Sequence, residues 1–454
     1  MNFHDAGLTP QTLFSRTNLW QCWLDVEAAM AQAQAEIGMI PQWAADEIGA
    51  RARLEMFDLD ALERSVAETM APIVSLVRAL TDLCGEAGRY VHWGGTTQNI
   101  MSTGRLLLVR RAHRAMLGQF AVTSERLSDW ADTHASTIMV GRTNNRHALP
   151  ITFGFKVAGW IEELARQNAR FEEVERRLFA LYFGGAIGAG HSFDGRGAEL
   201  SRVLARRLGF SEVLAPSRAS LDTMAEYVSS LGLFAMAAGR IGTELYRLMS
   251  QEVEEVSERL GEDVVGSSTM PHKVNPKHVV HLISTAAQLR AKVAPALEAG
   301  LPAHEGDASS NQLMSATLES ACTMGWDLAA RLAATLSRID IHPEAMRRNL
   351  GLSAEVIASE NVMMVLAPRV GRTRAHDLVH HAVAEAARRD APVVETLMAS
   401  PEVSATITRT DLQAALAPES YLGDSVAIAQ KAARLAAAMA AGLSERAASP
   451  ASQP

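Results

Sequence analysis

The sequence of 454 residues predicts an all-α protein. Along most of the chain, apolar residues recur at the three- and four-residue intervals of a buried helix face. The strict apolar/polar alternation that would indicate strands is almost absent. The longest helical pattern covers 223–260, and two further long patterns cover 278–298 and 312–337. Because such helices carry apolar stripes on more than one face, we expect a multi-helix bundle that other subunits complete.

The composition excludes several classes of protein. Apolar residues make up 48% and charged residues 21%, which is ordinary for a soluble globular protein. The net charge of −8 disfavours nucleic acid and anionic membranes as partners, since both attract clustered lysine and arginine. Cys22, Cys84 and Cys322 form no CxxC pair, so neither a disulfide framework nor a zinc site is expected.

No segment predicts secretion or membrane insertion. The first ten residues lack the basic and apolar regions of a signal peptide. The most apolar helical segment, 231–238, is far shorter than the roughly 20 residues of a membrane span. We therefore expect a cytoplasmic protein.

The first 90 residues predict one amphipathic helix followed by several short ones. Trp20 and Trp23 lie on the apolar face of the first helix and are expected in the core. Pro41, Asp58 and Pro72 each stand near the start of a short helix or a break between two.

Residues 92–104, HWGGTTQNIMSTG, form the first of three polar loops. The chemistry-bearing side chains of this loop are His92, Thr96, Thr97 and Asn99. Helix is expected to resume near residues 103–105 and to continue to about Asp132. A run of threonine and asparagine before a helix is most often a simple N-cap, so the loop alone does not decide between a structural and a functional role.

Residues 139–150, MVGRTNNRHALP, are predicted as the second polar loop. The side chains of interest here are Arg142, Thr143, Asn144 and His147. Pro150 is expected to begin a helix that continues to about Leu178. Four glycines follow between residues 184 and 190, but no strand precedes them, so they do not predict a dinucleotide-binding loop.

Three glycines interrupt the longest helical pattern. Gly232, Gly239 and Gly242 each cost about 1 kcal/mol relative to alanine in a helix. Either close packing against a neighbouring helix or a kink would account for them.

The third polar loop, 261–281, reads GEDVVGSSTMPHKVNPKHVVH, and a globular core does not explain it. Ser267, Ser268, Lys273 and Asn275 are the types of residue that hold and stabilise an anion. The alternative is a plain interhelical loop closed by Asn275 and Pro276. This segment also holds three histidines, His272, His278 and His281. Because paired helical histidines are usually surface or packing residues, we expect no metal site.

The third loop also carries a family resemblance. The string from Gly266 to Pro276, GSSTMPHKVNP, resembles the signature loop of the fumarase/aspartase superfamily. The similarity continues in family order through RYVHWGGTTQN, GRTNNRHALP, the glycine loop and residues 346–376. The turn at 421–423 resembles the 3-carboxy-cis,cis-muconate cycloisomerase branch. The chain is thus identified as a superfamily member, nearest that branch.

The resemblance implies three helical domains, whose central long-helix bundle forms a twenty-helix core in a homotetramer. We expect an N-terminal helical domain at 1–104, a central bundle at 105–342 that includes the signature loop 261–281, and a C-terminal helical domain at 343–443. The small polar residues of 444–454 predict a disordered tail. In this family three loops from three different subunits build each active site, so a single chain would lack a complete one.

The resemblance also implies a reaction, which is anti β-elimination, or the reverse addition, on a succinate-like dicarboxylate. A proton leaves the carbon next to a carboxylate and gives an aci-carboxylate with two negative charges, after which the group on the neighbouring carbon departs. Ser267 matches the general base of the family, and Ser268 is the competing assignment. Lys273, Asn275 and the backbone N–H groups of 266–268 suit stabilisation of the intermediate.

The other two loops supply the remaining candidates that the resemblance implies. Thr96, Thr97 and Thr143 suit the second carboxylate of the substrate. The further substrate-binding candidates are Asn99, Arg142, Asn144 and His147, and His92 is the further catalytic candidate. The family chemistry implies no cofactor and no metal.

One departure from the family pattern concerns the acid. Asn144 stands where the adenylosuccinate and argininosuccinate lyases carry a histidine, their usual candidate acid. Because asparagine does not donate a full proton at neutral pH, either the leaving group has a low pKa, as a carboxylate or nitrite does, or His92 or His147 takes the role of the acid.

Other departures concern charge. Val274 and Gly306 stand where the cycloisomerase branch tends to have arginine, and Asn361 stands where adenylosuccinate lyases tend to carry a phosphate-binding arginine. These losses argue against a phosphorylated nucleotide and weaken the case for a tricarboxylate. Arg218 or Arg372 could supply a replacement charge, although surface exposure is the ordinary interpretation of both.

The sequence therefore predicts a lyase that cleaves a C–N or C–O bond beta to a carboxylate and releases fumarate or a related unsaturated acid. The first alternative is 3-carboxy-cis,cis-muconate cycloisomerase itself. The second is a non-catalytic scaffold of the same fold, as in the lens crystallins of this superfamily. Retention of Ser267, Lys273 and Asn275 argues against the scaffold.

Overall fold

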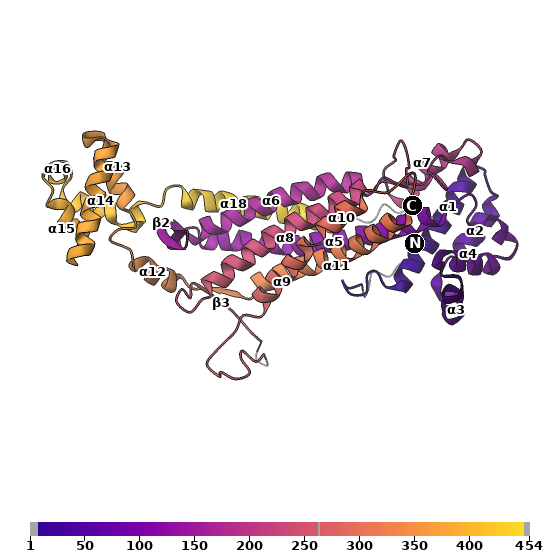
Figure 1. Cartoon of the computed structure of the whole chain (residues 1–454), viewed down its shortest axis with the longest axis horizontal. Coiled ribbons are helices and arrows are strands. Elements are labelled where there is room, and N and C mark those ends of the chain that lie inside the picture. Colours follow the sequence, from indigo (N-terminus) through magenta and orange to yellow (C-terminus); the bar gives the residue numbers. More distant parts are fainter. Residues whose placement is uncertain (1–7, 262–263, 449–454) are drawn as a thin grey trace.

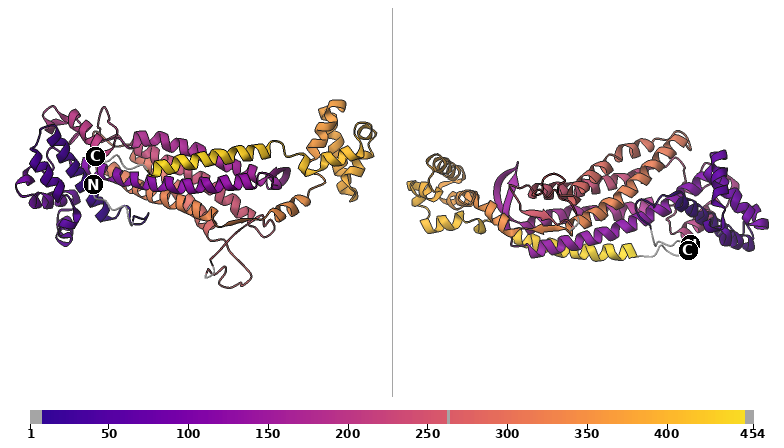
Figure 2. Two further views of the ribbon diagram at one scale, coloured as in Figure 1. Left: turned by 180° about the vertical axis from the view of Figure 1, so that it is seen from behind. Right: turned by 90° about the horizontal axis from the view of Figure 1, so that it is seen from below.

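The computed structural model describes residues 8–261 and 264–448, and it confirms the all-α prediction. Within these residues, strands are confined to two short two-stranded sheets. The molecule is elongated, with a long helical bundle in the middle and a smaller group of helices at each end (Figure 1). The same arrangement is visible from behind and from below (Figure 2).

Long helices build the central bundle. They are α5 (Thr97–Thr133), α6 (Phe153–Leu178), α8 (Asp222–Leu248), α9 (His278–Arg290), α11 (Ala308–Leu336) and α18 (Ser425–Ala448), with the shorter α10 (Val293–Ala299) beside them. The 37 residues of α5 extend roughly 55 Å at a rise of about 1.5 Å per residue. This one helix therefore separates the two ends of the bundle.

The N-terminal group of helices covers one end of the bundle (Figure 1). It contains α1 (Arg16–Glu36), α2 (Gln42–Arg51), α3 (Leu59–Thr69), α4 (Pro72–Leu83) and α7 (Gly197–Leu208), with short 3-10 turns η1 (Leu54–Met56), η2 (Gly85–Tyr90) and η3 (His191–Phe193). Trp20 and Trp23 are 2% and 5% exposed, so the prediction that they lie in the core is confirmed.

The opposite end carries a second group of helices with an apolar core of its own. It comprises α13 (Ser359–Val370), α14 (Arg372–Arg389), α15 (Val393–Met398), α16 (Pro401–Ser404), α17 (Arg409–Leu416) and the 3-10 turn η4 (Pro418–Ser420). Val362, Leu366 and Leu412 are fully buried in this separate core. The preceding helix α12 (Pro343–Gly351) packs against the strand at 138–143 and adds Met346 to the main core.

The expected C-terminal boundary needs correction. After α17 the chain returns to the bundle, and α18 packs along α5 and α6. Ser444–Ala448 continue this helix instead of starting a tail, and 449–454 lie outside the described residues. Ala433, Ala436 and Leu443 of α18 are buried in the main core, because small side chains let the helix approach its neighbours closely. Among the described residues, α18 alone is long and apolar enough to cross a membrane, but it packs here as a core helix does.

The second polar loop is a β-hairpin instead of the predicted loop. β1 (Ile138–Thr143) pairs antiparallel with β2 (Arg146–Thr152), and Pro150 lies in β2 opposite Val140. The following helix therefore begins at Phe153, where the Thr152 hydroxyl accepts a hydrogen bond from the Phe155 N–H at 3.1 Å. The second sheet joins β3 (Val256–Glu258) to β4 (Ile339–Ile341). The predicted helix over 223–260 accordingly ends at Leu248.

The glycines of α8 mark close packing. A Cβ atom on Gly232 would lie 2.5 Å from the Val293 side chain, and one on Gly242 would lie 3.0 Å from the Ile283 side chain. Because α8 is continuous from Asp222 to Leu248, close approach to α9 and α10 explains the glycines.

Two glycines of α6 give a matched test of this packing. A Cβ on Gly154 would lie 2.8 Å from the Ala131 carbonyl oxygen and 2.9 Å from the Ala429 Cβ, whereas a Cβ on Gly159 meets nothing within 4 Å. Gly154→Ala should lower the free energy of unfolding by about 1–3 kcal/mol. Gly159→Ala should raise it by up to about 1 kcal/mol. Urea denaturation of both variants measures these changes, and a Gly154→Ala protein as stable as the wild type would contradict the tight contact.

Candidate active site

The signature loop projects from the side of the bundle between β3 and α9 (Figure 1). Both of its ends are fixed by Glu258, whose carboxylate accepts hydrogen bonds from the N–H groups of Lys277, His278 and Val279 at 2.7, 2.9 and 3.0 Å. A carboxylate at this position also stabilises the helix N-terminus. The predicted loop 261–281 therefore ends at Lys277, since α9 begins at His278.

Inside the loop, Asn275 closes a tight turn. Its Nδ2 and its backbone N–H both donate to the Gly266 carbonyl oxygen, at 3.1 and 3.3 Å. A Cβ on Gly266 would lie 2.9 Å from the Lys273 carbonyl oxygen, so only glycine fits there. The side-chain amide of Asn275, expected to stabilise the intermediate, holds the loop together.

The predicted catalytic residues lie on the outside of this turn. Ser267 is half-buried, and its hydroxyl accepts a hydrogen bond from the Met270 N–H at 3.1 Å. Ser268 and Lys273 are exposed. Within the described residues, no side chain from elsewhere in the chain donates to or accepts from these three side chains. A single chain therefore presents Ser267, the predicted base, and Lys273 without enclosing them.

The first polar loop lies at the opposite end of the bundle, where α5 begins at Thr97, earlier than predicted. His92 Nδ1 lies 2.6 Å from Oε1 of Glu27, a carboxylate on α1 that is 1% exposed. Burial alone would lower the pKa of His92, but the hydrogen bond and charge of Glu27 outweigh it and raise that pKa. Thr96 occupies the N-cap position of α5 without a side-chain capping bond.

Asn99 has a structural role in this chain. It is 2% exposed, its Nδ2 donates to the Tyr182 carbonyl oxygen at 3.1 Å, and its Oδ1 accepts from the Gly185 N–H at 3.0 Å. Both ends of its amide are therefore used to attach the glycine loop to the first turn of α5.

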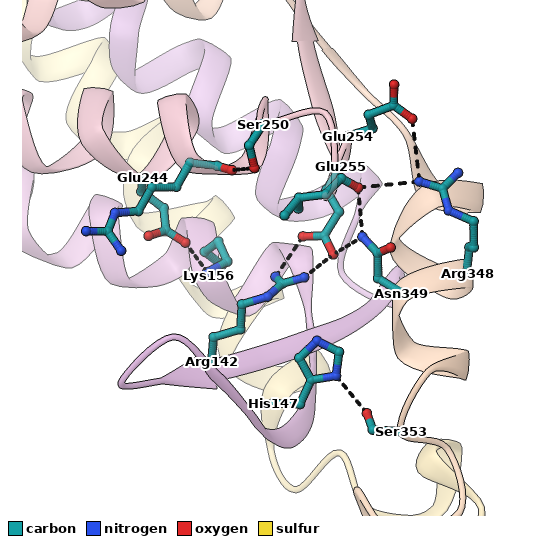
Figure 3. Close-up of polar contacts among 12 residues, drawn as sticks. Arg142, His147, Lys156, Glu244, Ser250, Glu254, Glu255, Arg348, Asn349 and Ser353 are labelled. Atoms are coloured by element: carbon teal, nitrogen blue, oxygen red, sulfur yellow. Dashed lines mark hydrogen bonds and ion pairs between the residues drawn. The ribbon is translucent and has the colours of Figure 1, made fainter.

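Arg142 fixes the hairpin close to its turn (Figure 3). Its guanidinium donates two hydrogen bonds to Glu255, at 2.9 and 2.6 Å, and Glu255 is fully buried. Asn349 of α12 donates to the same carboxylate at 2.9 Å. Arg142 is thus engaged in an internal ion pair, and its expected contact with substrate would have to compete with that pair.

The tip of the hairpin carries the other candidates. Thr143 and Asn144 are exposed, and Asn144 and Asn145 have φ values of 50° and 59°. Two consecutive positive φ angles define a type I′ turn, in which asparagine is favoured. His147 is held by a 2.8 Å contact between its Nδ1 and the Ser353 hydroxyl (Figure 3). Burial and then the Arg142 charge lower the pKa of His147.

A single chain does not bring the three loops together. The first loop lies at the start of α5 and the hairpin follows its end, so about 55 Å of helix separates them. The signature loop stands clear of the first loop as well (Figures 1 and 2). The first loop is therefore remote from the other two, whereas Arg142 of the hairpin contacts Glu255, three residues before the Glu258 that fixes the signature loop.

The histidines after the signature loop are engaged by arginines. Arg338 Nε lies 3.1 Å from His278 Nε2, and Arg331 Nη1 lies 3.4 Å from His281 Nδ1. In the described part of the chain, no three His, Cys, Asp or Glu side chains are grouped so that they could hold a metal ion.

The comparisons with known proteins now decide the family. Residues 6–290 match the family model described as lyase, and residues 355–432 match the model for the adenylosuccinate lyase C-terminus. The chain belongs to the fumarase/aspartase superfamily. The assignment that the signature loop predicted is confirmed, and so is the prediction that the protein is a lyase-family enzyme.

The relatives of this superfamily lyase differ in their named reactions. The present chain is 35% identical over 404 residues, 88% of each chain, to N-acetyl-S-(2-succino)cysteine lyase of Enterococcus italicus. It is 34% identical over 426 residues, 93% of each chain, to 3-carboxy-cis,cis-muconate cycloisomerase of Pseudomonas aeruginosa. The crystal structure of a fumarate lyase from Mesorhizobium sp. BNC1 superimposes with a TM-score of 0.87 and 30% identity, over 94% of this chain and 99% of that one.

The sequence analysis missed three glutamates that hold site residues of this superfamily lyase. Glu27 holds His92, Glu255 holds Arg142, and Glu258 fixes the signature loop. Glu255 and Glu258 lie in a segment predicted as helix, where an exposed glutamate is expected. Glu27 did leave a signal, because it follows Trp23 by four residues on the apolar face of the first helix.

The pair of His92 and Glu27 should make stability depend on pH. The pair raises the pKa of His92 above the value of about 6.5 expected in the unfolded chain. Its contribution is therefore complete below pH 6.5 and is lost as the pH rises through the pKa of the folded state. Glu27→Gln should cost about 1–3 kcal/mol of unfolding free energy at low pH and less at pH 9, measured by urea denaturation.

Glu63→Gln is the matched control, since its pair with Arg16 is exposed and contains no histidine. Its cost should be about 0–1 kcal/mol at both pH values. An equal cost of Glu27→Gln at low and high pH would contradict the assignment of the shift to this pair.

Proposed function

We propose that the enzyme catalyses anti β-elimination from a succinate-like dicarboxylate through an aci-carboxylate intermediate and releases fumarate or a related unsaturated acid. The observation that carries the proposal is the signature loop, which is fixed at both ends and presents Ser267 and Lys273 outward. Ser267 takes the proton from carbon. Lys273 and the N–H groups of the Gly266 turn stabilise the two negative charges.

A base of this kind needs a closed site. The serine hydroxyl is a poor base in water, and it requires neighbouring amides and a cation to favour its alkoxide. Lys273 is exposed in a single chain, so the enclosing groups have to come from elsewhere. We infer that a homotetramer supplies them, with each active site shared by three subunits.

Two features support the shared site. The first loop and the hairpin are separated by the length of α5, so no single chain can place both on one small substrate. The bundle helices also expose large apolar side chains, including Met236, Leu233, Leu297 and Leu313. Exposed large apolar side chains on long helices support an interface between subunits.

Mixing two inactive variants tests the shared site. Ser267→Ala removes the proposed base, and Thr97→Ala removes a hydroxyl of the first loop that binds a substrate carboxylate. Each variant alone should therefore be nearly inactive. If the two residues act from different subunits, about a quarter of the sites in an equal mixture contain neither lesion. The activity of co-expressed or co-refolded mixtures, compared with each variant alone, measures this recovery. If one chain supplied both residues, every site would carry a lesion and mixing would restore nothing.

The leaving group in our proposal departs as an anion. Asn144 donates no full proton, and the type I′ turn places it exposed at the hairpin tip. A thiolate suits such a site, because a thiol with a pKa near 8.5 leaves without a strong acid. The sequence predicted C–N or C–O cleavage; the relative named for N-acetyl-S-(2-succino)cysteine now favours C–S cleavage. The C–H proton passes to Ser267, and the electron pair of the broken C–S bond leaves with sulfur.

The substrate test uses N-acetyl-S-(2-succino)cysteine. The wild type should release fumarate and free thiol in equal amounts, followed by ultraviolet absorbance and a thiol reagent. Ser267→Ala should lower kcat by about 10²- to 10⁴-fold, whereas Ser268→Ala should retain most activity. The opposite result for the two serines would move the base to Ser268.

The cycloisomerase is the second candidate, because the similarity to the Pseudomonas aeruginosa enzyme covers 93% of this chain. Turnover of 3-carboxy-cis,cis-muconate without fumarate release from the thioether would favour it. Inactivity on both substrates would favour the non-catalytic scaffold.

A further inference from the structure

Arg218 lies between α7 and α8, at the same end of the bundle as the first polar loop. Its Nη1 donates to the Ala186 carbonyl oxygen, and its Nε is buried without a hydrogen-bond partner. Among the described residues no carboxylate forms an ion pair with it. Leaving a buried N–H of a guanidinium without an acceptor costs free energy, so this half-buried arginine differs from the paired arginines of the neighbouring helix α7.

A small cleft of about 30 Å³, with Leu106, Leu221 and Met224 among its apolar lining residues, adjoins Arg218. Gln98 and Ser102 of α5, Ser220 before α8, and Asn311 of α11 line it. These neutral groups donate hydrogen bonds and carry no negative charge. A volume of this size holds about two water-sized atoms. The cleft therefore matches the two oxygens of one carboxylate and excludes a ring or a whole substrate.

The surrounding backbone also favours an anion. The helices α5, α8 and α11 all begin around the cleft, and helix N-termini carry partial positive charge. Two acidic residues stand at these starts, Asp222 and Asp307. The Asp307 carboxylate accepts from the Ser309 N–H at 2.8 Å as the cap of its own helix. Burial and then the Asp222 charge raise the pKa of Tyr182, which lines the cleft, but among the described residues neither carboxylate forms an ion pair with Arg218.

Gly306, which has no side chain, lies against the guanidinium of Arg218. A Cβ on Gly306 would lie 3.5 Å from Arg218 Cζ and 3.6 Å from Nη2, so the backbone of the loop before α11 packs on Arg218. Gly306 stands where the cycloisomerase branch tends to have arginine, and the sequence offers Arg218 or Arg372 as a replacement charge. Because the two residues are in contact, Arg218 supplies its charge at the place where Gly306 carries none.

We propose that Arg218 binds a third carboxylate of the substrate, carried by the leaving group, and so determines which leaving groups are accepted. The inference rests on the proposed function, in which Thr96, Thr97 and Lys273 bind the two carboxylates of the succinyl part. The cleft begins at Gln98, directly after Thr97, so one substrate can reach both. The ordinary interpretation of Arg218 as a surface residue does not account for its buried Nε.

Two thioethers that differ by one carboxylate test the proposal. The succinyl adduct of N-acetylcysteine carries the third carboxylate, and the adduct of N-acetylcysteamine is the same compound without it. The wild type should prefer the first by roughly 10- to 100-fold in kcat/KM. Arg218→Gln should abolish that preference, because it should slow elimination only from the thioether that carries the third carboxylate. Arg218→Lys should restore part of the preference.

Arg202→Gln is the matched control, because Arg202 is an exposed arginine of α7 paired with Glu212; it should behave as the wild type. If Arg218 only holds the Ala186 loop, Arg218→Gln slows both thioethers equally and the proposal is wrong. A wild type that eliminates both thioethers equally well also overturns it, while the proposed function stands. A wild type inactive on both removes the proposed function and this inference together.

Discussion

The length of α5 is the constraint on which the active-site architecture depends. A continuous helix of 37 residues is rigid over roughly 55 Å, and the first loop and the hairpin flank its two ends. No rotation of side chains can bring Thr97 and His147 onto one dicarboxylate within a chain. In the homotetramer that we propose, antiparallel packing of such helices between subunits places the end of one beside the start of another. The length of α5 then sets the distances within the proposed shared site.

Three glutamates hold the loops in position. Glu27, Glu255 and Glu258 each accept hydrogen bonds from a residue or a backbone segment of one loop. Glu27 and Glu255 are buried, where a carboxylate without a partner is costly, so these two contacts are difficult to release, whereas Glu258 is half-buried. Ser267 is half-buried and Thr143 is exposed. This division suits the shared site that we propose.

Local sequence patterns predicted most of the helices, and the signature loop led to the family assignment that the comparisons confirm. They failed at the hairpin, because its strands are short and its turn is built from Asn144 and Asn145. The positive φ angles of these two residues leave no trace in the spacing of apolar residues. They also failed at α18, since the small residues after Ser444 suit both a tail and a tightly packed helix. The roles of Asn99 and Arg142 depend on partners more than eighty residues away in the chain. The contact of Arg218 with Gly306 has the same origin, and only the fold reveals it.

The return of the chain into the bundle as α18 has a consequence for how this superfamily diversifies. The helices α13 to α17 form an insertion, with both of its connections at the same end of the bundle (Figure 1). Their apolar core is independent of the main one, and a separate family model matches this region. The insertion can therefore change in length or composition during evolution without shifting the helices that carry the three loops.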